Sequence, residues 1–377
     1  MLIVFTILAL TILALYSFLI LSFFAGWLRT RRWHPDQKAA VTRVSILIPC
    51  RNEAENIAEL SVLLEDQDYP GDLLEVIWID DHSTDGTPDI LSDRIQGRKH
   101  MHVARLDGSI TGKKAALKLG MESASGELIL LTDADSRPGP RWVKIMAKYF
   151  EDTRNDLIIG PVVLDPARTW FDQIQKLEYL SLVASSIGAA GIGRPIMAQG
   201  PNIAVRATDY ANMVDDLDNR FASGDDVFLL QAMKKLTGKK IGYVMNPDAI
   251  VRSKPAKSLT DFMHQRQRWA SKAKGYLDRF MILTTLVVFI ANLEILATAV
   301  FALVGLVPAY LVLILLGIKT LADLPILFVT LRFFSCTKLV IWLLPVQVLY
   351  PFYIGVAGIL SQISRIRWKN HVGAQDD

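Results

Sequence analysis

The chain has 377 residues, of which 51% are hydrophobic, and a mean hydropathy of +0.29, so it carries more apolar side chains than a soluble domain needs for its core. Its net charge of +3 excludes the broad basic surface of a nucleic-acid-binding protein, and no nucleic-acid partner is expected. The two cysteines, Cys50 and Cys336, lie far apart in unrelated contexts, which argues against a disulfide framework or a cysteine zinc site.

The first segment, residues 1–28, has no charged residue and is longer than the roughly 20 residues that a helix needs to cross a bilayer. It therefore predicts an N-terminal transmembrane helix. A cleaved signal peptide is the alternative, but Arg29, Arg31 and Arg32 stand where a small-residue cleavage site would be expected. The same arginines predict that the following domain is cytoplasmic, in an integral protein of the plasma (inner) membrane.

Residues 41–276 have the composition of a soluble α/β domain, in which short apolar runs alternate with helical stretches. This pattern predicts a mostly parallel, Rossmann-like sheet covered on both faces, with ligands at the C-terminal ends of its strands. The expected strands are residues 44–49, 74–79, 128–132 and 157–163, and helices are expected after Asn52, Thr87 and Gly112.

Polar motifs follow three of these strands: P-C-R-N-E at 49–53, D-D-H-S-T-D-G-T at 80–87 and T-D-A-D at 132–135. Because parallel strands end at one edge, we expect these acids and amides to lie close together. Turn and helix-cap chemistry is an alternative interpretation of Asn52 and of residues 85–87.

Asp133 and Asp135 occupy alternate positions after an apolar strand, so in an extended segment both carboxylates would point the same way. No cationic neighbour is evident in the sequence, and such a pair is costly unless it holds a cation. Hard oxygen ligands suit Mg²⁺ or Mn²⁺, which leave coordination positions for substrate phosphates.

In their order along the chain, these motifs resemble those of the family 2 glycosyltransferases, whose catalytic domain has the GT-A fold. The resemblance covers residues 44–269. It rests on P-x-x-N-E at 49–53, D-D-x-S-x-D-x-T at 80–87, G-K-x-x-A-L at 112–117, DxD at 133–135, G-x-N-x-x-x-R at 200–206, D-D at 225–226 and Q-x-x-R-W at 265–269.

The resemblance implies an inverting transferase of a hexosyl or N-acetylhexosaminyl group, with a nucleotide sugar, in particular a UDP-sugar, as donor and Mg²⁺ or Mn²⁺ as cofactor. Asp226, beside Asp225, aligns with the catalytic base. The implied nucleotide-sugar site comprises Pro49, Asn52, Glu53, Asp80, Asp81, Lys113 and Asp133. The implied metal ligands are Asp135 and Asp133, and the acceptor or diphosphate site comprises Gly200, Asn202, Gln265, Arg268 and Trp269.

Trp269 follows a basic cluster, and two other interpretations stand beside a sugar-stacking role. The tryptophan could be packed in an interface. Residues 254–274 are also rich in Lys and Arg, as expected of a helix that lies on anionic lipid headgroups.

Residues 280–362 form a C-terminal membrane region of three apolar segments, near 280–301, 303–334 and 339–360. Lys319 and Asp323 are four residues apart, so they can pair and lower their cost in lipid. Arg332 and Lys338 favour the cytoplasmic side, and so do the basic residues after position 364. A single crossing by the last apolar segment would put these two groups on opposite sides. The number of crossings stays open.

The acceptor class is less constrained. The Q-x-x-R-W element recurs in processive polysaccharide synthases and also resembles that of ceramide glucosyltransferase, which modifies a lipid. Three C-terminal segments are few for a polymer channel, so a membrane lipid or lipid-linked glycan is the favoured acceptor. A processive synthase, and a non-catalytic export subunit with a decayed transferase domain, are the alternatives.

Overall fold

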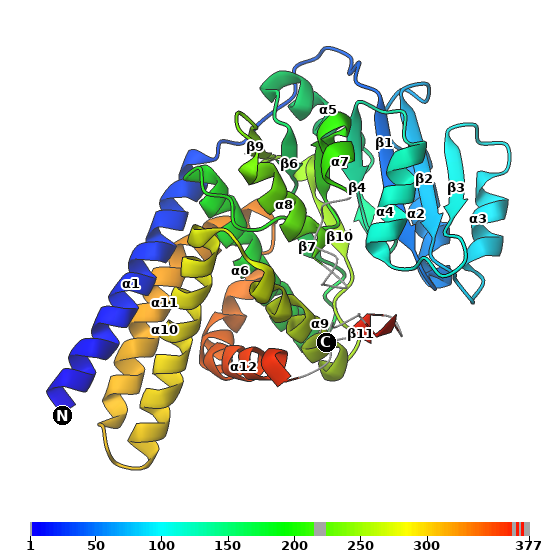
Figure 1. Ribbon diagram of the computed structural model, residues 1–377. Coiled ribbons are helices and arrows are strands. Elements are labelled where there is room, and N and C mark those ends of the chain that lie inside the picture. Colours follow the sequence, from blue (N-terminus) through cyan, green and yellow to red (C-terminus); the bar gives the residue numbers. More distant parts are fainter. Residues whose placement is uncertain (1, 215–223, 364–366, 369–370, 373–377) are drawn as a thin grey trace. The chain divides into compact units, whose positions relative to one another are not determined.

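The structure is a computed structural model that describes residues 2–214, 224–363, 367–368 and 371–372. The described chain forms two compact units, and each is assembled from separated segments (Figure 1). We call them the sheet unit, residues 31–165 and 197–254, and the helical unit, residues 2–30, 166–196 and 255–372. The predicted domain range 41–276 therefore includes segments of both units.

The sheet unit is built on seven strands in the order β3-β2-β1-β4-β8-β6-β9. The first four in this order are mutually parallel, β8 is antiparallel to both of its neighbours, and β6 and β9 are parallel, so the predicted mostly parallel sheet is confirmed. The strands are β1 (Val44–Cys50), β2 (Leu74–Asp80), β3 (Met101–Arg105), β4 (Leu128–Leu131), β6 (Leu157–Ile159), β8 (Ile203–Arg206) and β9 (Ile241–Tyr243).

Helices connect these strands, and the three that the sequence predicts are present. Strands β1, β2 and β4 are almost completely buried, because helices cover both faces of the sheet (Figure 1). This burial matches the continuous apolar character of their sequences. The helices of this unit are α2 (Ala54–Glu65), α3 (Thr87–Ile95), α4 (Lys113–Ser123), α5 (Trp142–Thr153), α7 (Ala207–Met213), α8 (Asp225–Lys235) and the 3₁₀ turn η1 (Pro247–Ala249).

The prediction of one strand over residues 157–163 is wrong. The chain leaves the large sheet after β6 and enters a second sheet as β7 (Val162–Leu164). There β7 pairs with β10 (Val251–Ser253), which pairs on its other side with β5 (Arg137–Pro138). Gly160 and Pro161 separate the two strands, and Pro161 has no N–H to continue a ladder. The amide of Asn202 fills the space beside Gly160, where a Cβ would lie 2.3 Å from it.

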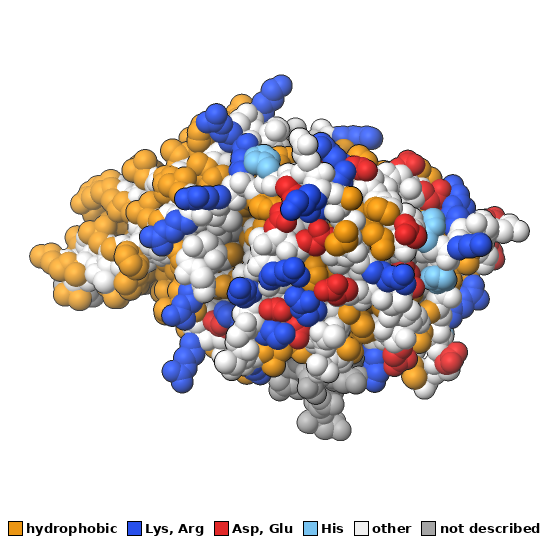
Figure 2. Space-filling view, turned by 90° about the horizontal axis from the view of Figure 1, so that it is seen from above, with side chains coloured by type: hydrophobic (Ala, Val, Ile, Leu, Met, Phe, Trp, Pro, Cys, Tyr) orange, Lys and Arg blue, Asp and Glu red, His pale blue; other side chains and the backbone are white. Residues whose placement is uncertain are grey.

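Within its described residues, the helical unit contains four helices that are long and apolar enough to cross a membrane: α1 (Leu2–Arg29), α10 (Arg279–Leu303), α11 (Ala309–Phe333) and a segment over Thr337–Val356. Their exposed side chains are almost all hydrophobic, and Figure 2 shows a continuous hydrophobic surface of this kind at the left of the view. The other elements are α6 (Trp170–Gly191), α9 (Leu259–Ser271), η2 (Lys272–Gly275), η3 (Thr337–Trp342), α12 (Leu343–Ile363), β11 (Arg367–Trp368) and β12 (His371–Val372).

Helix α1 packs directly on α6 through glycines. A Cβ built on Gly26 would lie 2.0 Å from the carbonyl oxygen of Gly188, and one on Gly191 would lie 2.0 Å from that of Gly26. Small residues at such contacts let two helix backbones approach closely, as is common in membranes. Helix α6 was not predicted as part of a membrane-type unit.

A buried polar cluster joins three helices of this unit, and it contains the predicted pair of Lys319 and Asp323. Their ammonium and carboxylate groups lie 2.9 Å apart, which confirms the pairing. Tyr16 of α1 donates to Asp323 at 2.6 Å, and Gln347 of α12 accepts from Lys319 at 2.6 Å. The charges are therefore balanced and hydrogen-bonded, as buried charges must be.

Candidate functional site

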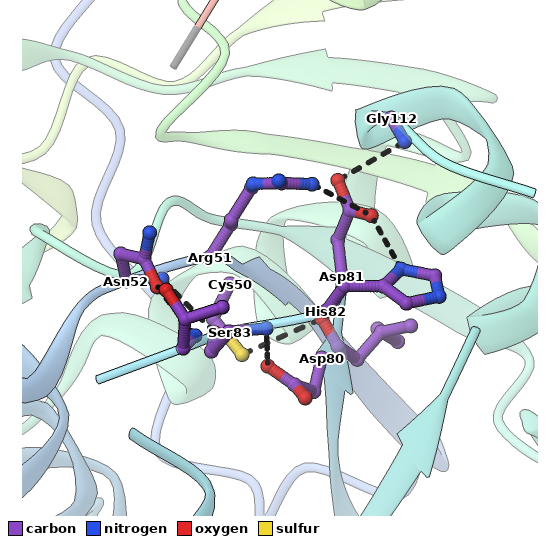
Figure 3. A network of polar contacts seen from close by, with 10 residues as sticks. Cys50, Arg51, Asn52, Asp80, Asp81, His82, Ser83 and Gly112 are labelled. Carbon is purple, nitrogen blue, oxygen red and sulfur yellow. Dashed lines mark hydrogen bonds and ion pairs between the residues drawn. The ribbon is translucent and has the colours of Figure 1, made fainter. Parts of the chain in front are cut away.

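The parallel register brings the first two polar motifs together. Cys50 is paired with Asp80 across β1 and β2, so the residues that follow each strand start from adjacent points on one sheet edge (Figure 3). Asn52 takes a left-handed backbone conformation with φ of +52°, and its N–H donates to Ser83 Oγ at 2.9 Å. Its side-chain oxygen accepts from the Thr84 N–H at 2.8 Å, so the two loops are held to each other.

The acids of the second motif have protein partners. Asp81 is 1% exposed and accepts from the Gly112 N–H at 3.0 Å, while the Arg51 guanidinium lies 3.4 Å away (Figure 3). Asp80 accepts from the Ser83 N–H at 3.3 Å. Arg51, which the sequence did not single out, thus contributes a positive charge beside Asp81.

Glu53 and Asp85 supply turn and cap interactions around the same loops. The Glu53 N–H donates to Thr87 Oγ1 at 2.8 Å, and its carboxylate accepts from Asn56 at 2.6 Å. Asp85 accepts from the N–H groups of Ala54 at 3.1 Å and Thr87 at 3.0 Å, at the starts of α2 and α3. Burial raises the pKa of Asp85, but these hydrogen bonds outweigh it and keep the pKa below its usual value.

A cavity lies beside these loops in the sheet unit. Several of the predicted site residues line it, although they come from five separate stretches of sequence. The residues that line it are Pro49, Lys113, Leu117, Leu131, Thr132, Asp133, Gly200, Ile203, Asp225 and Asp226.

Lys113 and Asp133 form an ion pair in this cavity, with 2.5 Å between Nζ and Oδ1. Burial lowers the pKa of Lys113, but the carboxylates of Asp133, Asp225 and Asp226 outweigh it and raise the pKa above its ordinary value. The expectation that the acids of the DxD motif lack a cationic neighbour is therefore wrong for Asp133. The expected extended segment is also wrong, because residues 134–135 form a turn.

The carboxylates of Asp133 and Asp135 fit a divalent metal that takes its remaining ligands from a bound substrate. Among the described residues, no group of three or more His, Cys, Asp and Glu side chains is placed to hold a metal ion by itself. Asp133 and Asp135 supply two partly exposed carboxylates. Mg²⁺ is commonly bound in this way, by one or two carboxylates together with substrate phosphates.

Asp226 stands at the start of α8, where Gly224 provides a left-handed turn with φ of +111°. One of its carboxylate oxygens accepts from the Gly200 N–H at 3.3 Å and the other from the Val227 N–H at 2.8 Å. Asp225 beside it is 7% exposed. Helix N-terminal N–H groups favour a negative charge at this position. Ser223, the first residue of the predicted element, lies outside the described residues.

Asn202 does not line the cavity, contrary to its predicted place in the acceptor or diphosphate site. It is fully buried, accepts from Trp142 Nε1 at 2.9 Å and donates to the carbonyls of Pro161 at 2.9 Å and Ala249 at 2.8 Å. The Asn202 amide therefore holds the segment between the two sheets in place. Of Gly200 and Asn202, which were both predicted for the acceptor or diphosphate site, Gly200 lines the cavity and Asn202 does not.

Gln265, Arg268 and Trp269 lie on α9, in the helical unit, and are partly exposed. Their neighbour Arg266 is 2% exposed and pairs with Glu178 of α6. This pair was not predicted, because its two members are 88 positions apart and no local pattern indicates it.

Comparison with known protein families gives two overlapping matches. The model of the family described as Glycosyl transferase family 2 matches residues 45–209. That of Glycosyl transferase family group 2 matches residues 128–354, more than half of the chain.

Curated relatives match over part of their length. A beta-monoglucosyldiacylglycerol synthase from Synechocystis sp. is 28% identical over 249 residues, which cover 63% of this chain and 49% of the relative. An N-acetylglucosaminyltransferase from Rhizobium meliloti is 25% identical over 261 residues, covering 67% of this chain and 60% of the relative. The chain thus spans between about half and 60% of the length of these two relatives.

A solved structure matches nearly the whole chain. It is the mannosyltransferase PcManGT from Pyrobaculum calidifontis in complex with GDP-Man and Mn²⁺, with a TM-score of 0.57 and 19% identity, covering 96% of this chain and 97% of that one. At this identity the likeness concerns the fold, and it confirms the predicted GT-A class with accompanying membrane-type helices.

Proposed function

We propose that this chain, which belongs to the family 2 glycosyltransferases, moves a sugar from a nucleoside diphosphate sugar to a lipid or lipid-linked acceptor at the cytoplasmic face of the membrane. The observation that carries the proposal is the cavity in which Lys113, Asp133 and Asp226 lie together. It combines a cation for a diphosphate, a carboxylate for a metal and a carboxylate that can act as a base.

The donor binds along the sheet edge. The loops that contain Pro49, Asn52 and Glu53 and the adjoining Asp80 and Asp81 form the nucleotide side of this edge. The ammonium of Lys113 offsets the charge of the diphosphate. A UDP-sugar is the first donor to test, and GDP-Man is the natural comparison because the similar solved mannosyltransferase holds it.

Asp226 accepts the proton of the acceptor hydroxyl as that oxygen bonds to the anomeric carbon of the donor. The Gly200 N–H holds one oxygen of this carboxylate, so its orientation is fixed before the acceptor arrives. The bond from the anomeric carbon to the diphosphate breaks in the same displacement, which inverts the anomeric centre. Mg²⁺ or Mn²⁺, held by Asp133 and Asp135 together with the diphosphate, would stabilise the charge of the leaving nucleoside diphosphate.

The acceptor is a membrane lipid or a lipid-linked glycan. The proposal is supported by four helices of the helical unit, among the described residues, that are long and apolar enough to cross a bilayer. The Synechocystis relative is by name a synthase of monoglucosyldiacylglycerol, which makes diacylglycerol the first acceptor to test. Gln265, Arg268 and Trp269 of α9 are the proposed contacts to the acceptor or the diphosphate.

Orientation in the membrane follows from the charges next to α1. Arg29, Arg31 and Arg32 follow this helix directly, and basic residues stay on the cytoplasmic side. The sheet unit is therefore cytoplasmic, and the proposed location is the plasma (inner) membrane.

The test uses the full chain in lipid nanodiscs that contain dioleoylglycerol or a total lipid extract, with Mn²⁺ or Mg²⁺. UDP-Glc, UDP-GlcNAc, UDP-Gal and GDP-Man are offered separately, nucleoside diphosphate release is measured, and products are identified by mass spectrometry. A glycolipid with one added sugar supports the proposal. A long polymer identifies a processive synthase, and donor binding without any release identifies a non-catalytic subunit.

A further inference from the structure

The guanidinium of Arg266 lies at the centre of the contacts that hold α9. It makes a two-pronged ion pair with Glu178 of α6, through Nε to Oε1 at 3.1 Å and through Nη2 to Oε2. Arg266 is 2% exposed and Glu178 is 4% exposed. Tyr353 of α12 also donates to Glu178 at 3.2 Å, so the carboxylate is fixed from a third helix.

The same guanidinium contacts two residues of the Q-x-x-R-W element. It lies 4.2 Å from the centre of the Trp269 ring, and its Nη1 donates to the side-chain oxygen of Gln265. Phe262, one turn earlier on α9, packs against Arg266 with 4.4 Å to its ring centre. One indole face of Trp269 is thus covered by a cation whose position α6 determines.

We infer that the ion pair of Glu178 and Arg266 positions Gln265 and Trp269 for the acceptor, and that Arg266 is a positioning residue of the reaction. The inference rests on the proposed function of the Q-x-x-R-W element. A planar guanidinium can pair with a carboxylate through two bonds and stack on an aromatic ring at the same time, which an ammonium cannot do. The geometry therefore uses properties that arginine alone provides.

A packing role without consequence for the acceptor is the competing explanation, because a buried pair also stabilises a fold. A matched control separates the two. The helical unit contains a second buried ion pair, Lys319 and Asp323, which is also hydrogen-bonded and, among the described residues, reaches the first pair indirectly, by way of Tyr350 and Tyr353 of α12. Removing either pair would cause a general loss of stability. Removing the pair of Glu178 and Arg266 would in addition displace Gln265 and Trp269, which removal of the other pair would not do.

The experiment compares E178M/R266M with K319M/D323M in nanodiscs. Both variants replace a charge-balanced buried pair by apolar side chains, a change that is often tolerated. With dioleoylglycerol as acceptor and the donor found active above, we expect E178M/R266M to raise the acceptor KM about tenfold to a hundredfold, the scale of a misplaced substrate contact. Donor hydrolysis without acceptor should stay within about twofold of wild type, and K319M/D323M should keep the wild-type acceptor KM.

Fluorine NMR gives a second readout that does not need turnover. Of the eight tryptophans, labelled as 5-fluorotryptophan, Trp269 is assigned by the signal that W269F removes. Its signal should shift or broaden in E178M/R266M and stay unchanged in K319M/D323M. Absence of turnover in the wild type would count against the proposed function, whereas unchanged signals would count against the positioning.

R266K keeps the inference falsifiable if E178M/R266M does not fold. It retains the charge but loses the second bond and the planar stack, so the same rise in acceptor KM and the same change of the Trp269 signal are expected. An acceptor KM and a Trp269 signal like those of wild type would overturn the inference. An equal fall of donor hydrolysis and transfer would overturn it as well, because that result indicates a structural role only.

Discussion

The ammonium nitrogen of Lys113 lies 2.5 Å from Oδ1 of Asp133, so the first carboxylate of the DxD motif is already neutralised by a cation of the protein. A divalent metal that binds Asp133 must compete with this cation. A diphosphate can accept the ammonium instead, since phosphate oxygens and carboxylates are both strong partners for lysine. Metal and donor are therefore expected to bind cooperatively.

Replacing Lys113 by Met tests this coupling. We expect Lys113→Met to tighten Mn²⁺ binding in the absence of nucleotide by about tenfold, because one unit of competing charge near the site is removed. The same change should weaken UDP binding, because the diphosphate loses a cationic partner. Titration calorimetry measures both affinities.

Lys144→Met is the control for Lys113→Met, since Lys144 forms a comparable ion pair with Asp68 at 2.7 Å on the exposed surface. It should leave both affinities unchanged. Mn²⁺ binding that is equally weak in Lys113→Met and wild type would show that the lysine does not compete with the metal.

Asp226→Asn is expected to lower turnover by about 10²-fold or more, because an amide cannot accept the proton of the acceptor hydroxyl. The amide oxygen can still accept from the Gly200 N–H, so the loop should keep its place and the affinities for UDP and Mn²⁺ should be retained. Steady-state rates and calorimetry provide the comparison. Turnover at the wild-type rate in this variant would remove Asp226 from the mechanism.

Asn202→Ala should destabilise the fold rather than alter ligand binding. The change leaves the N–H of Trp142 and the carbonyl of Ala249 without this partner in a buried place and removes one of two hydrogen bonds to the Pro161 carbonyl, which keeps the Val251 N–H; we expect the loss to cost about 3 kcal/mol. Thermal unfolding followed by tryptophan fluorescence measures the loss. If the melting temperature is unchanged and the donor KM rises instead, the residue acts on the ligand.

Lys319→Met alone should be strongly destabilising, by about 3 to 5 kcal/mol, because it leaves the carboxylate of Asp323 buried without its cation. The double variant K319M/D323M should recover most of this stability, since no charge is then left unpaired. Melting curves in nanodiscs compare the two. Equal losses in the single and double variants would show that the pair itself does not govern stability here.

We expect the stability of the sheet unit to depend on pH because of the surroundings of Glu151. Its carboxylate accepts from the N–H groups of Val41 at 2.8 Å and Thr42 at 3.0 Å and lies 3.2 Å from Lys148. Burial raises its pKa, but these partners outweigh that effect and keep the pKa below its ordinary value of 4.5. Because the folded-state pKa is depressed, the stability it contributes is present above the unfolded-state pKa and is lost as pH falls through the folded-state pKa.

Glu151→Gln should therefore lower the stability of the protein by about 1 kcal/mol at pH 7. The difference in melting temperature between this variant and wild type should shrink as the pH is lowered from about 5 toward 3. A difference that stays constant over this range would mean that the charge of Glu151 is not what matters.

Local patterns predicted the parts of the fold that depend on neighbouring residues. The strands at 44–50, 74–80 and 128–131 follow from their apolar runs, and the parallel register then places the motifs after them at one edge. The start of α6 had a local signal as well, because Thr169 and Asp172 form a capping box.

Features that depend on distant contacts were not predictable in this way. Residues 157–163 look like one strand because both halves are apolar, and the packing of Asn202 against Gly160 contributes to the change of sheet together with Pro161, which has no N–H for a ladder. The ion pair of Lys113 and Asp133 and that of Glu178 and Arg266 join residues 20 and 88 positions apart. The spacing of a motif indicates which of its residues belong to a site, but it does not indicate which distant residues pair with them.

The bond between Tyr16 and Asp323 joins residues 307 positions apart in the chain. At a synthesis rate of about 5 to 20 residues per second, Tyr16 waits roughly 15 to 60 seconds for this hydrogen-bond partner to be synthesised. During that time the whole sheet unit leaves the ribosome and has time to fold. Helix α1 can pack on α6 earlier in synthesis, but Tyr16 has to wait for Asp323, so the helical unit can be completed only near the end of translation.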